Sequence, residues 1–458
     1  MQTLAIIFIF LFKGKKLKNL KELFTQGGSR KMEHKKSSKD IIVFGFALFA
    51  MFFGAGNLIF PPYLGIITGP KWLISFIGFT FADAGLALLA VMAATKFEGD
   101  LNKMFSRAGE KLGIAIGCAD ILCIGPLLAI PRTGATTYEM GIMPIFGDKI
   151  PVVLFCIVFF VITYILTIKP SKVIDIVGQF LTPALLIALA VIIVKGVISP
   201  LGPIIKEPMI EGVVAEGIAQ GYQTMDAFAA IALASVLIVS MNEKGYTETS
   251  DKLKAILKAG ALACVGLALV YGGLCYLGAT VSTFNDVNAV QTQVIVNITQ
   301  GLLGNVGKTV LAVAVALACL TTSIGLTSAT GQYFANLTKG KISYGKIVLA
   351  VCIFSACMAS IGVGAIIKFA SPILSIVYPP TIVLIVLAFF TEKIENDNVY
   401  KFATYMSLII STLTVLQSYG VNVPFINSLP FAPLGFNWVV PVIIAGIIGN
   451  FVKPKKAC

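Results

Sequence analysis

Residues 44–62 (FGFALFAMFFGAGNLIFPP) form an apolar run that is long enough to enter a lipid bilayer, but its middle does not suit a continuous helix. Gly54, Ala55, Gly56 and Asn57 follow one another there, and a glycine costs a helix interior roughly 1 kcal/mol relative to alanine. Non-helical backbone is tolerated at membrane depth only where protein or a water-filled cavity satisfies its N–H and C=O groups. Two interpretations stay open at this point: a helix that is broken at 54–57, or a continuous helix whose small residues pack closely against a neighbour.

The composition places the chain in a membrane and excludes several functions. Hydrophobic residues make up 57% of the chain and charged residues 12%, whereas about 25% is typical of soluble domains. His34 is the only histidine, so histidine-based catalysis is not available. The nine cysteines include no CxxC pair, which favours neither a disulfide framework nor a metal site. A membrane enzyme would need a cluster of acids, bases or metal ligands at one membrane face, and a passive channel would need a ring-forming filter. We recognise neither pattern.

Twelve apolar segments follow Asp40, so we expect an all-α, multi-pass membrane protein. Residues 1–39 precede them as a basic tail, within which residues 1–31 are expected to be an upstream extension that is weakly structured or not made. The expected spans are 41–67, 72–95, 112–131, 151–168, 173–198, 213–240, 257–281, 306–335, 345–366, 372–391, 400–418 and 436–452.

Lysine and arginine are distributed unevenly between the two sides of these spans. With the N-terminal tail inside, 28 of the 35 lysines and arginines fall on the cytoplasmic side. The remaining seven are placed outside or at outer span ends: Lys71, Arg132, Lys149, Lys195, Lys206, Lys308 and Lys368. Positive charge concentrates in cytoplasmic loops of membrane proteins, so both termini are expected in the cytoplasm. The net charge of +13 then faces anionic lipid headgroups, and no nucleic acid is needed to explain it.

A second interrupted span occurs at 213–240, where polar residues 220–226 (QGYQTMD) lie in an apolar setting. Asp226 would be costly in lipid, and such a residue is a candidate functional group. The first span starts inside and the sixth starts outside, so two five-span halves that each open with a broken helix are related by inversion. This arrangement is typical of secondary transporters, whose broken helices meet at a midplane site.

The eighth span carries three hydroxyl side chains in succession, at 321–323 (TTS). These hydroxyls could bond to the carbonyl one turn earlier, as they often do in membrane helices. Alternatively they could contribute to a sodium site, since Na⁺ is a hard cation that takes carbonyl and hydroxyl oxygens. A broken first helix would supply the carbonyls that such a site also needs.

Four segments carry a resemblance to a known family: GAGNLIFPPYLG at 54–65, IPRTGATTYE at 130–139, AQGYQTMDAF at 219–228 and LACLTTSIG at 317–325. They resemble the bacterial branched-chain amino acid carriers (the BrnQ-type LIVCS family), and the resemblance extends from Asp40 to the C-terminus. It implies a LeuT-like 5+5 inverted repeat with discontinuous first and sixth helices. The implied divisions are a tail at 1–39, a first repeat at 40–198, an inverted repeat at 199–391, and two further helices with a basic tail at 392–458.

The resemblance also implies ligands for the coupling ion. One Na⁺ would be held by carbonyls of Ala50, Phe53 and Ala318 and by hydroxyls of Thr321 and Thr322. A second candidate site would use the Phe52 carbonyl, Asn57 and Thr224. We expect one site rather than two, because the seventh span offers no asparagine at a comparable depth.

Free N–H groups where the first helix restarts, at Gly54, Ala55 and Gly56, are expected to hold a substrate carboxylate. Free carbonyls at the sixth-span break, together with Asp226, are expected to hold an ammonium group, so that the site selects a zwitterionic amino acid. The rest of the pocket is expected to come from Phe53, Tyr222, Thr224 and Phe228 and from the third span, with no basic side chain at that depth.

Two further acidic residues, Asp83 and Asp120, lie within expected spans. Each could be a proton-relay or coupling-ion group, or could pair with a neighbouring hydroxyl or amide. We therefore predict a symporter in the bacterial plasma membrane that imports L-leucine, L-isoleucine and L-valine with Na⁺. The alternatives are a proton-coupled carrier of another neutral amino acid and a non-transporting amino acid sensor on the same fold.

Overall fold

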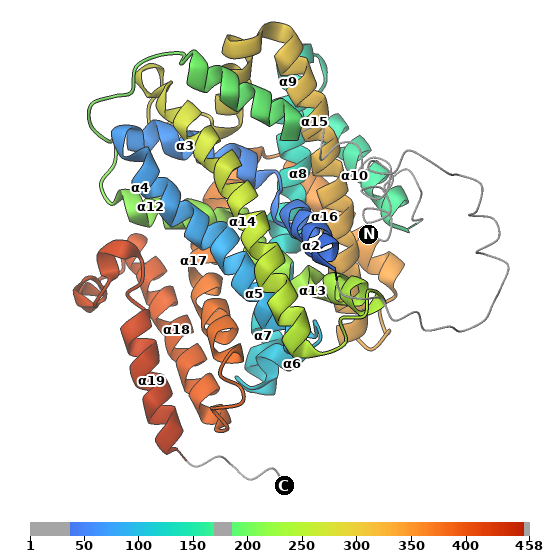
Figure 1. The fold of residues 1–458 in the computed structure, drawn as a ribbon, viewed down its shortest axis with the longest axis vertical. Coiled ribbons are helices and arrows are strands. Elements are labelled where there is room, and N and C mark those ends of the chain that lie inside the picture. The colour runs from blue at the N-terminus through green and yellow to red at the C-terminus, as the bar shows by residue number, and fades with distance from the viewer. Residues whose placement is uncertain (1–36, 169–185, 453–458) are drawn as a thin grey trace, which may run out of the picture.

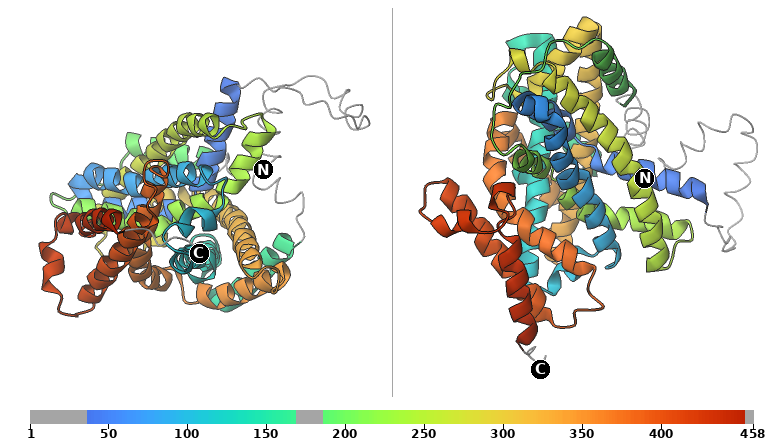
Figure 2. Two further views of the ribbon diagram at one scale, coloured as in Figure 1. Left: turned by 90° about the horizontal axis from the view of Figure 1, so that it is seen from below. Right: turned by 60° about the vertical axis from the view of Figure 1, so that its left-hand side comes forward.

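The computed structural model describes residues 37–168 and 186–452, and the regular elements of that part are helices (Figures 1 and 2). The expected extension at 1–31 and most of the expected fifth span lie outside the described residues. The helices before the first gap are α2 (Ser38–Phe52), α3 (Gly56–Thr68), α4 (Trp72–Thr80), α5 (Leu86–Thr95), α6 (Leu101–Ser106), α7 (Glu110–Leu122), α8 (Ala129–Thr137), α9 (Met143–Phe146) and α10 (Val152–Ile168). After it come a helix at Leu186–Ile198, then α12 (Val213–Thr224), α13 (Asp226–Glu243), α14 (Thr249–Ala279), α15 (Gln291–Leu337), α16 (Tyr344–Ala359), α17 (Val363–Ala388), α18 (Asp397–Ser418) and α19 (Val439–Phe451).

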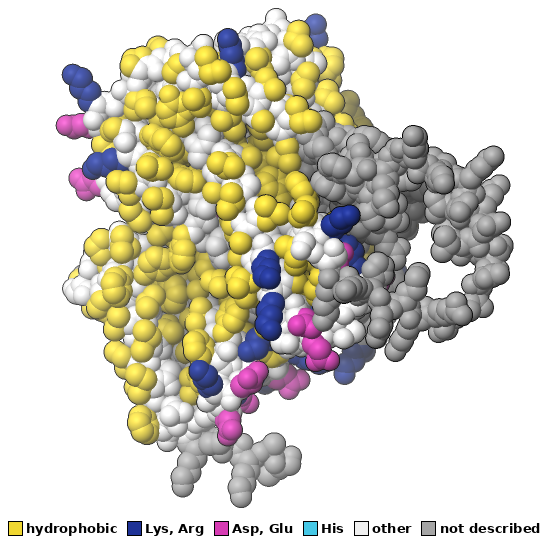
Figure 3. All heavy atoms as spheres, in the orientation of Figure 1, with side chains coloured by type: hydrophobic (Ala, Val, Ile, Leu, Met, Phe, Trp, Pro, Cys, Tyr) yellow, Lys and Arg dark blue, Asp and Glu magenta, His cyan; other side chains and the backbone are white. Residues whose placement is uncertain are grey.

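Seven helical segments of the described chain are long and apolar enough to cross a membrane. Large apolar side chains also cover much of the outer surface, as the face in Figure 3 shows. On α10, Val153, Ile157, Val161 and Ile165 recur every four residues and are each about half exposed. Because residues four apart share one face of a helix, this stripe faces outward, where water would be an unfavourable neighbour. The chain is a multi-pass membrane protein.

Both predicted helix interruptions are present. The first helix ends at Phe52, Phe53 is extended (φ −99°, ψ 101°), and α3 begins at Gly56. The second break is at Met225, which adopts a left-handed conformation (φ 64°, ψ 20°) between α12 and α13. A residue with a side chain seldom adopts that conformation, and where it does the surrounding structure must hold it there.

The third expected span, 112–131, was given too short an extent in the sequence analysis. The helix does not stop at residue 131 but continues through α8 and a wide helical turn at Tyr138–Ile142. The chain bends earlier, at Gly125 (φ −88°, ψ −133°), within Cys123–Leu127. Pro131 then lies in the first turn of α8. The N–H groups of a first turn have no acceptor within the helix, so the N–H that proline lacks costs little there. Residue 131, at which the expected third span ended, therefore lies in the first turn of a helix.

Two glycines allow α3 and α14 to approach closely. A Cβ placed on Gly65 would lie 1.9 Å from the Cys275 carbonyl oxygen, and one on Gly278 would lie 1.9 Å from the Pro62 carbonyl oxygen. Both obstacles are backbone atoms, which cannot move without displacing a helix. The contact fixes the position of α3 and so of the first helix break.

We expect Gly278→Ala to lower the melting temperature of the detergent-solubilised protein by several degrees, because overpacking of this kind costs about 1–3 kcal/mol. The matched control is Gly364→Ala in α17, where a Cβ would meet no atom within 4 Å. An unchanged melting temperature for Gly278→Ala would contradict the close approach of α3 and α14.

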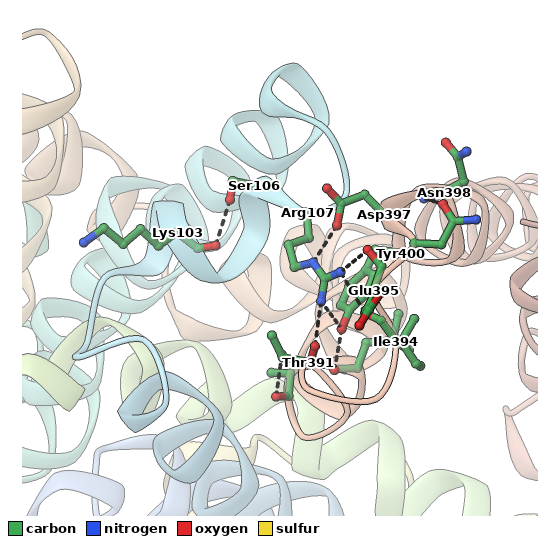
Figure 4. Close-up of polar contacts among 12 residues, drawn as sticks. Lys103, Ser106, Arg107, Thr391, Ile394, Glu395, Asp397, Asn398 and Tyr400 are labelled. Carbon is green, nitrogen blue, oxygen red and sulfur yellow. Dashed lines mark hydrogen bonds and ion pairs between the residues drawn. The ribbon is translucent and has the colours of Figure 1, made fainter. Parts of the chain in front are cut away.

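The C-terminal helices α18 and α19 lie at the edge of the molecule, where α18 packs against both α19 and α17 (Figure 2). Arg107, between α6 and α7, holds the turn between α17 and α18 (Figure 4). Its guanidinium donates to Asp397 (2.6 Å), to the Tyr400 hydroxyl (2.7 Å) and to the carbonyl of Ile394 (2.8 Å). Asp397 is 64% exposed, so the bonds to carbonyl and hydroxyl oxygens contribute more to this attachment than the ion pair does.

Candidate functional site

The two helix breaks face one cavity of about 240 Å³ near the middle of the bundle. Its walls come from five places: the break between α2 and α3, the turn at Cys123–Leu127, the start of α8, the break between α12 and α13 with the first turns of α13, and the middle of α15. The lining residues are Ala50, Met51, Phe53, Gly54, Ala55, Gly56, Asn57, Ile124, Ala129, Arg132, Thr133, Thr224, Met225, Asp226, Ala229, Leu233, Thr321, Thr322, Gly325 and Leu326. Most of these side chains are apolar or small, and the polar ones come from the two helix breaks, the start of α8 and the middle of α15.

Four residues of the predicted first sodium site line this cavity: Ala50, Phe53, Thr321 and Thr322. The N–H of Gly54 donates to Asn57 Oδ1 (3.1 Å), so it is directed away from the Ala50 carbonyl, its partner in an uninterrupted helix. Contrary to expectation, this N–H is therefore not free to hold a substrate carboxylate. The fifth residue, Ala318, accepts a hydrogen bond from the Thr321 hydroxyl (2.8 Å), which is the local bond that the sequence analysis left open. That bond uses the hydroxyl proton and leaves oxygen lone pairs on Thr321 for another partner.

The second candidate sodium site is centred on Asn57, which is fully buried. The Asn57 amide nitrogen donates to the Phe52 carbonyl (3.1 Å) and to Asp226 Oδ2 (2.9 Å), and it contacts the Tyr271 hydroxyl of α14. Both carboxylate oxygens of Asp83, in the helical turn Phe81–Gly85, lie 3.4 Å from the same nitrogen. The seventh span therefore contributes a tyrosine hydroxyl where the sequence analysis looked for an asparagine.

This cluster contains more acceptors than donors. The donors are the two N–H bonds of the asparagine amide and the O–H of Tyr271, which donates to the Phe52 carbonyl. The acceptors are that carbonyl, the Tyr271 oxygen and the four oxygens of two carboxylates. Neither Asp83 nor Asp226 forms an ion pair within the described chain. Such an excess of oxygen is what a bound cation or an added proton satisfies.

The other acidic residue of the sequence analysis, Asp120, lies apart from the cavity lining. It is buried and accepts a hydrogen bond from the Thr381 hydroxyl of α17 (2.9 Å). Asp83 likewise has an amide partner in Asn57. Asp120 thus pairs with a hydroxyl and Asp83 with an amide, as one of the two interpretations in the sequence analysis expected.

The predicted substrate-binding residues are only partly brought together. Phe53, Gly54, Ala55, Gly56, Thr224 and Asp226 line the cavity, whereas Tyr222 and Phe228 are absent from its lining. Their rings pack instead on Tyr378 of α17, with centroids 4.3 Å and 4.2 Å away. They stabilise the helices behind the site and do not form its wall.

Arg132 is the cavity residue that the sequence analysis missed, because it expected no basic side chain from the third span and counted Arg132 among the outer groups. The structure places it in the cavity wall and 4% exposed. Its guanidinium donates to the carbonyls of Gln223 (2.5 Å) and Thr224 (3.3 Å). These two carbonyls at the sixth-span break are therefore not free, contrary to expectation. The sequence signal that could have located Arg132 is the segment IPRTG, because a proline is common in the first turn of a helix and Pro131 lies there in α8.

A larger cavity borders the central one. The central cavity shares Leu233 and Gly325 with this cavity of about 630 Å³, which is bordered by the 99–102 segment and by α15. A cavity of about 480 Å³ near Glu139 shares no lining residue with the central cavity. Glu139 accepts hydrogen bonds from the Thr292 hydroxyl of α15 (2.5 Å) and from the Val363 N–H of α17 (2.8 Å), and so links these two helices. Of these two neighbouring cavities, the one at the 99–102 segment is the one that borders the central cavity.

Two comparisons with solved structures identify the fold. An inward-facing structure of Mhp1 matches with a TM-score of 0.60, at 12% identity, over 90% of each chain. A closed conformation of the same transporter with bromovinylhydantoin bound matches with a TM-score of 0.58, at 14% identity, over 89% of this chain and 91% of that one. At such identities the match concerns the fold, which is that of Mhp1.

Comparisons of sequence find relatives of higher identity than these structures. The family model described as "Branched-chain amino acid transport protein" matches residues 37–456. Branched-chain amino acid permease BraB of Bacillus subtilis is 37% identical, over 93% of this chain and 99% of its own. Permeases named BrnQ are 35% identical in Bacillus subtilis (92% and 98% covered) and 32% identical in Salmonella typhimurium (91% and 96% covered). The relatives are permeases, and the chain is not an enzyme. It belongs to the branched-chain amino acid transport protein family.

Proposed function

We propose that the chain is a symporter that imports L-leucine, L-isoleucine and L-valine together with Na⁺ by alternating access. The observation that supports this most is the single cavity onto which both helix breaks and the threonine pair of α15 open. The names of the relatives support the substrate class. The larger cavity that shares Leu233 and Gly325 with this site would serve as its access route in a carrier that exposes its site to one face at a time.

The proposal includes the architecture. Twelve spans would comprise two inverted repeats of five helices, at 40–198 and 199–391, followed by α18 and α19. Both termini would be cytoplasmic in a bacterial plasma membrane, with lysines and arginines facing anionic lipid. The likeness to Mhp1 supports the core arrangement. The cavity at the 99–102 segment would then open to the cytoplasm.

Sodium would bind at the Ala50 and Phe53 carbonyls, the Ala318 carbonyl and the Thr321 and Thr322 hydroxyls. The break after Phe52 supports this site, since it frees carbonyls beside α15. The oxygen-rich cluster at Phe52, Asn57 and Thr224 is a candidate for a second cation, with Asp83 and Tyr271 as additional oxygen donors. Coupling to protons is the alternative, and uptake measured with and without Na⁺ at several pH values separates the two.

The substrate side chain would lie against the apolar wall formed by Met51, Ile124, Met225, Leu233 and Leu326. An aliphatic side chain buries apolar area there, worth about 25 cal/mol per Å². An apolar pocket distinguishes side chains that differ by one methylene by only about 1–3 kcal/mol. The wall therefore favours branched aliphatic side chains without separating them sharply.

Competition against labelled leucine tests the substrate class. We expect unlabelled isoleucine and valine to inhibit uptake with potencies within about tenfold of leucine. Lysine and glutamate should inhibit weakly, because their side-chain charges would be buried against this apolar wall. Strong inhibition by lysine or glutamate, with none by valine, would contradict the apolar wall.

A further inference from the structure

Arg132 lies between the two helix breaks. It caps the C-terminal end of α12 through the carbonyls of Gln223 and Thr224. On its other side it meets Gly56, the first residue of α3, where a Cβ would lie 3.0 Å from Arg132 Nη2 and 3.4 Å from Cζ. The ring of Phe60 lies 5.3 Å from Cζ. The guanidinium is thus held in place by backbone oxygens on one side and by the start of α3 on the other.

The charge of Arg132 has no counter-ion at contact distance. The ion pairs within the described chain involve Lys103, Arg107, Lys244 and Lys252, and none includes Arg132. Its bonds to two carbonyls satisfy two of the five N–H donors of a guanidinium. Asp226 lines the same cavity but does not contact the guanidinium, and a buried charge that is not paired at contact distance is costly. The position therefore suits an anion that arrives from the cavity.

The start of α3 favours the same kind of ligand. The first N–H groups of a helix lack helical acceptors, and the positive end of the helix dipole attracts anions. Gly56 and Arg132 line the same cavity. At this break the Gly54 N–H donates to Asn57 Oδ1, and the N–H groups of Asn57 and Leu58 donate to nearby carbonyls. A carboxylate placed beside Gly56 would therefore meet the N–H groups of Ala55 and Gly56 from one direction and the guanidinium from another.

We propose that Arg132 binds the α-carboxylate of the transported amino acid, in addition to capping α12. This inference rests on the proposed function and adds to it a specificity-determining residue. The guanidinium offers two parallel N–H donors to a carboxylate, which explains the use of arginine at this position. Because Arg132 already occupies the Gln223 and Thr224 carbonyls, the substrate ammonium is left to Asp226, whose carboxylate lines the same cavity.

The test compares binding of leucine with binding of leucinamide, which keeps the ammonium and side chain but has no carboxylate. Both are measured on the full chain in detergent, in the parent protein, in Arg132→Gln and in Arg132→Lys. We expect the parent to prefer leucine and Arg132→Gln to lose affinity for leucine by about 30-fold or more, with little change for leucinamide. Arg132→Lys keeps the charge but not the two-point contact, so an intermediate loss is expected.

Arg107→Lys is the matched control, because Arg107 is an arginine outside the cavity; its preference for leucine over leucinamide should equal that of the parent. An equal loss of both ligands in folded Arg132 variants would overturn the assignment, and so would a failure of both variants to fold, since Arg132 would then serve the fold alone. A parent protein that binds no branched-chain amino acid would instead overturn the proposed function.

Discussion

A Thr322→Ala variant is expected to need about ten times more sodium, or more, for half-maximal leucine uptake. The substitution removes one oxygen from a site with five predicted ligands, and hydrogen-bond-like contacts to a charged group are worth about 1.5–3 kcal/mol, where 1.4 kcal/mol is tenfold. Thr322 lines the cavity next to Thr321. Uptake of labelled leucine into proteoliposomes at a series of sodium concentrations measures the change.

Thr322→Ser is the matched control, because it keeps the hydroxyl and loses only a methyl group; it should retain sodium dependence close to that of the parent. The sodium assignment fails if the half-saturating concentration is the same in Thr322→Ala as in the parent, or if the parent takes up leucine equally well without sodium at every pH. Proton coupling through Asp83, Asp120 or Asp226 would then replace it.

Asn57→Ala is expected to abolish measurable leucine uptake and to destabilise the protein by about 3 kcal/mol or more. The amide joins both sides of the first helix break, since it accepts from the Gly54 N–H and donates to the Phe52 carbonyl. It also donates to Asp226 at the start of α13. Each buried partner left unpaired costs about 1–3 kcal/mol, and a charged partner costs more.

The comparison for this variant is Asn336→Ala, whose side chain bonds an exposed glutamine, Gln332 (3.1 Å). A surface change of this kind is usually worth about 0.5 kcal/mol or less. Melting temperature and leucine uptake are measured for both variants. An Asn57→Ala protein that melts with the parent and transports leucine at the parental rate would show that Asn57 does not hold the break together.

The helix breaks could be predicted from the sequence because their signals are local. Two glycines and an asparagine within an apolar run cost helix stability, and the polar residues of the sixth span needed partners in the protein interior. Asp226 and Asn57 were therefore recognised individually as candidates. Their contact with one another and with Asp83 and Tyr271 joins four separate helical segments, which no local pattern predicts.

The errors also have physical causes. Pro131 and Arg132 look like the end of a span because proline disfavours helix interiors and arginine disfavours lipid. Proline is tolerated in the first turn of a helix, and arginine is stabilised by the open carbonyls of a helix end. Tyr222 and Phe228 lie next to the break in sequence, but their rings point to Tyr378. Side-chain direction around an irregular backbone depends on its dihedral angles, which the sequence does not reveal.

Counterflow of labelled leucine in proteoliposomes tests the central proposal most directly. Vesicles that contain the purified protein are loaded with unlabelled leucine and sodium, then diluted into buffer with a trace of labelled leucine. A sodium-coupled carrier is expected to accumulate the label transiently, to do so as well when loaded with isoleucine or valine, and to do so far less without sodium. Binding of leucine to the protein without any accumulation of label inside the vesicles would contradict transport and indicate a sensor.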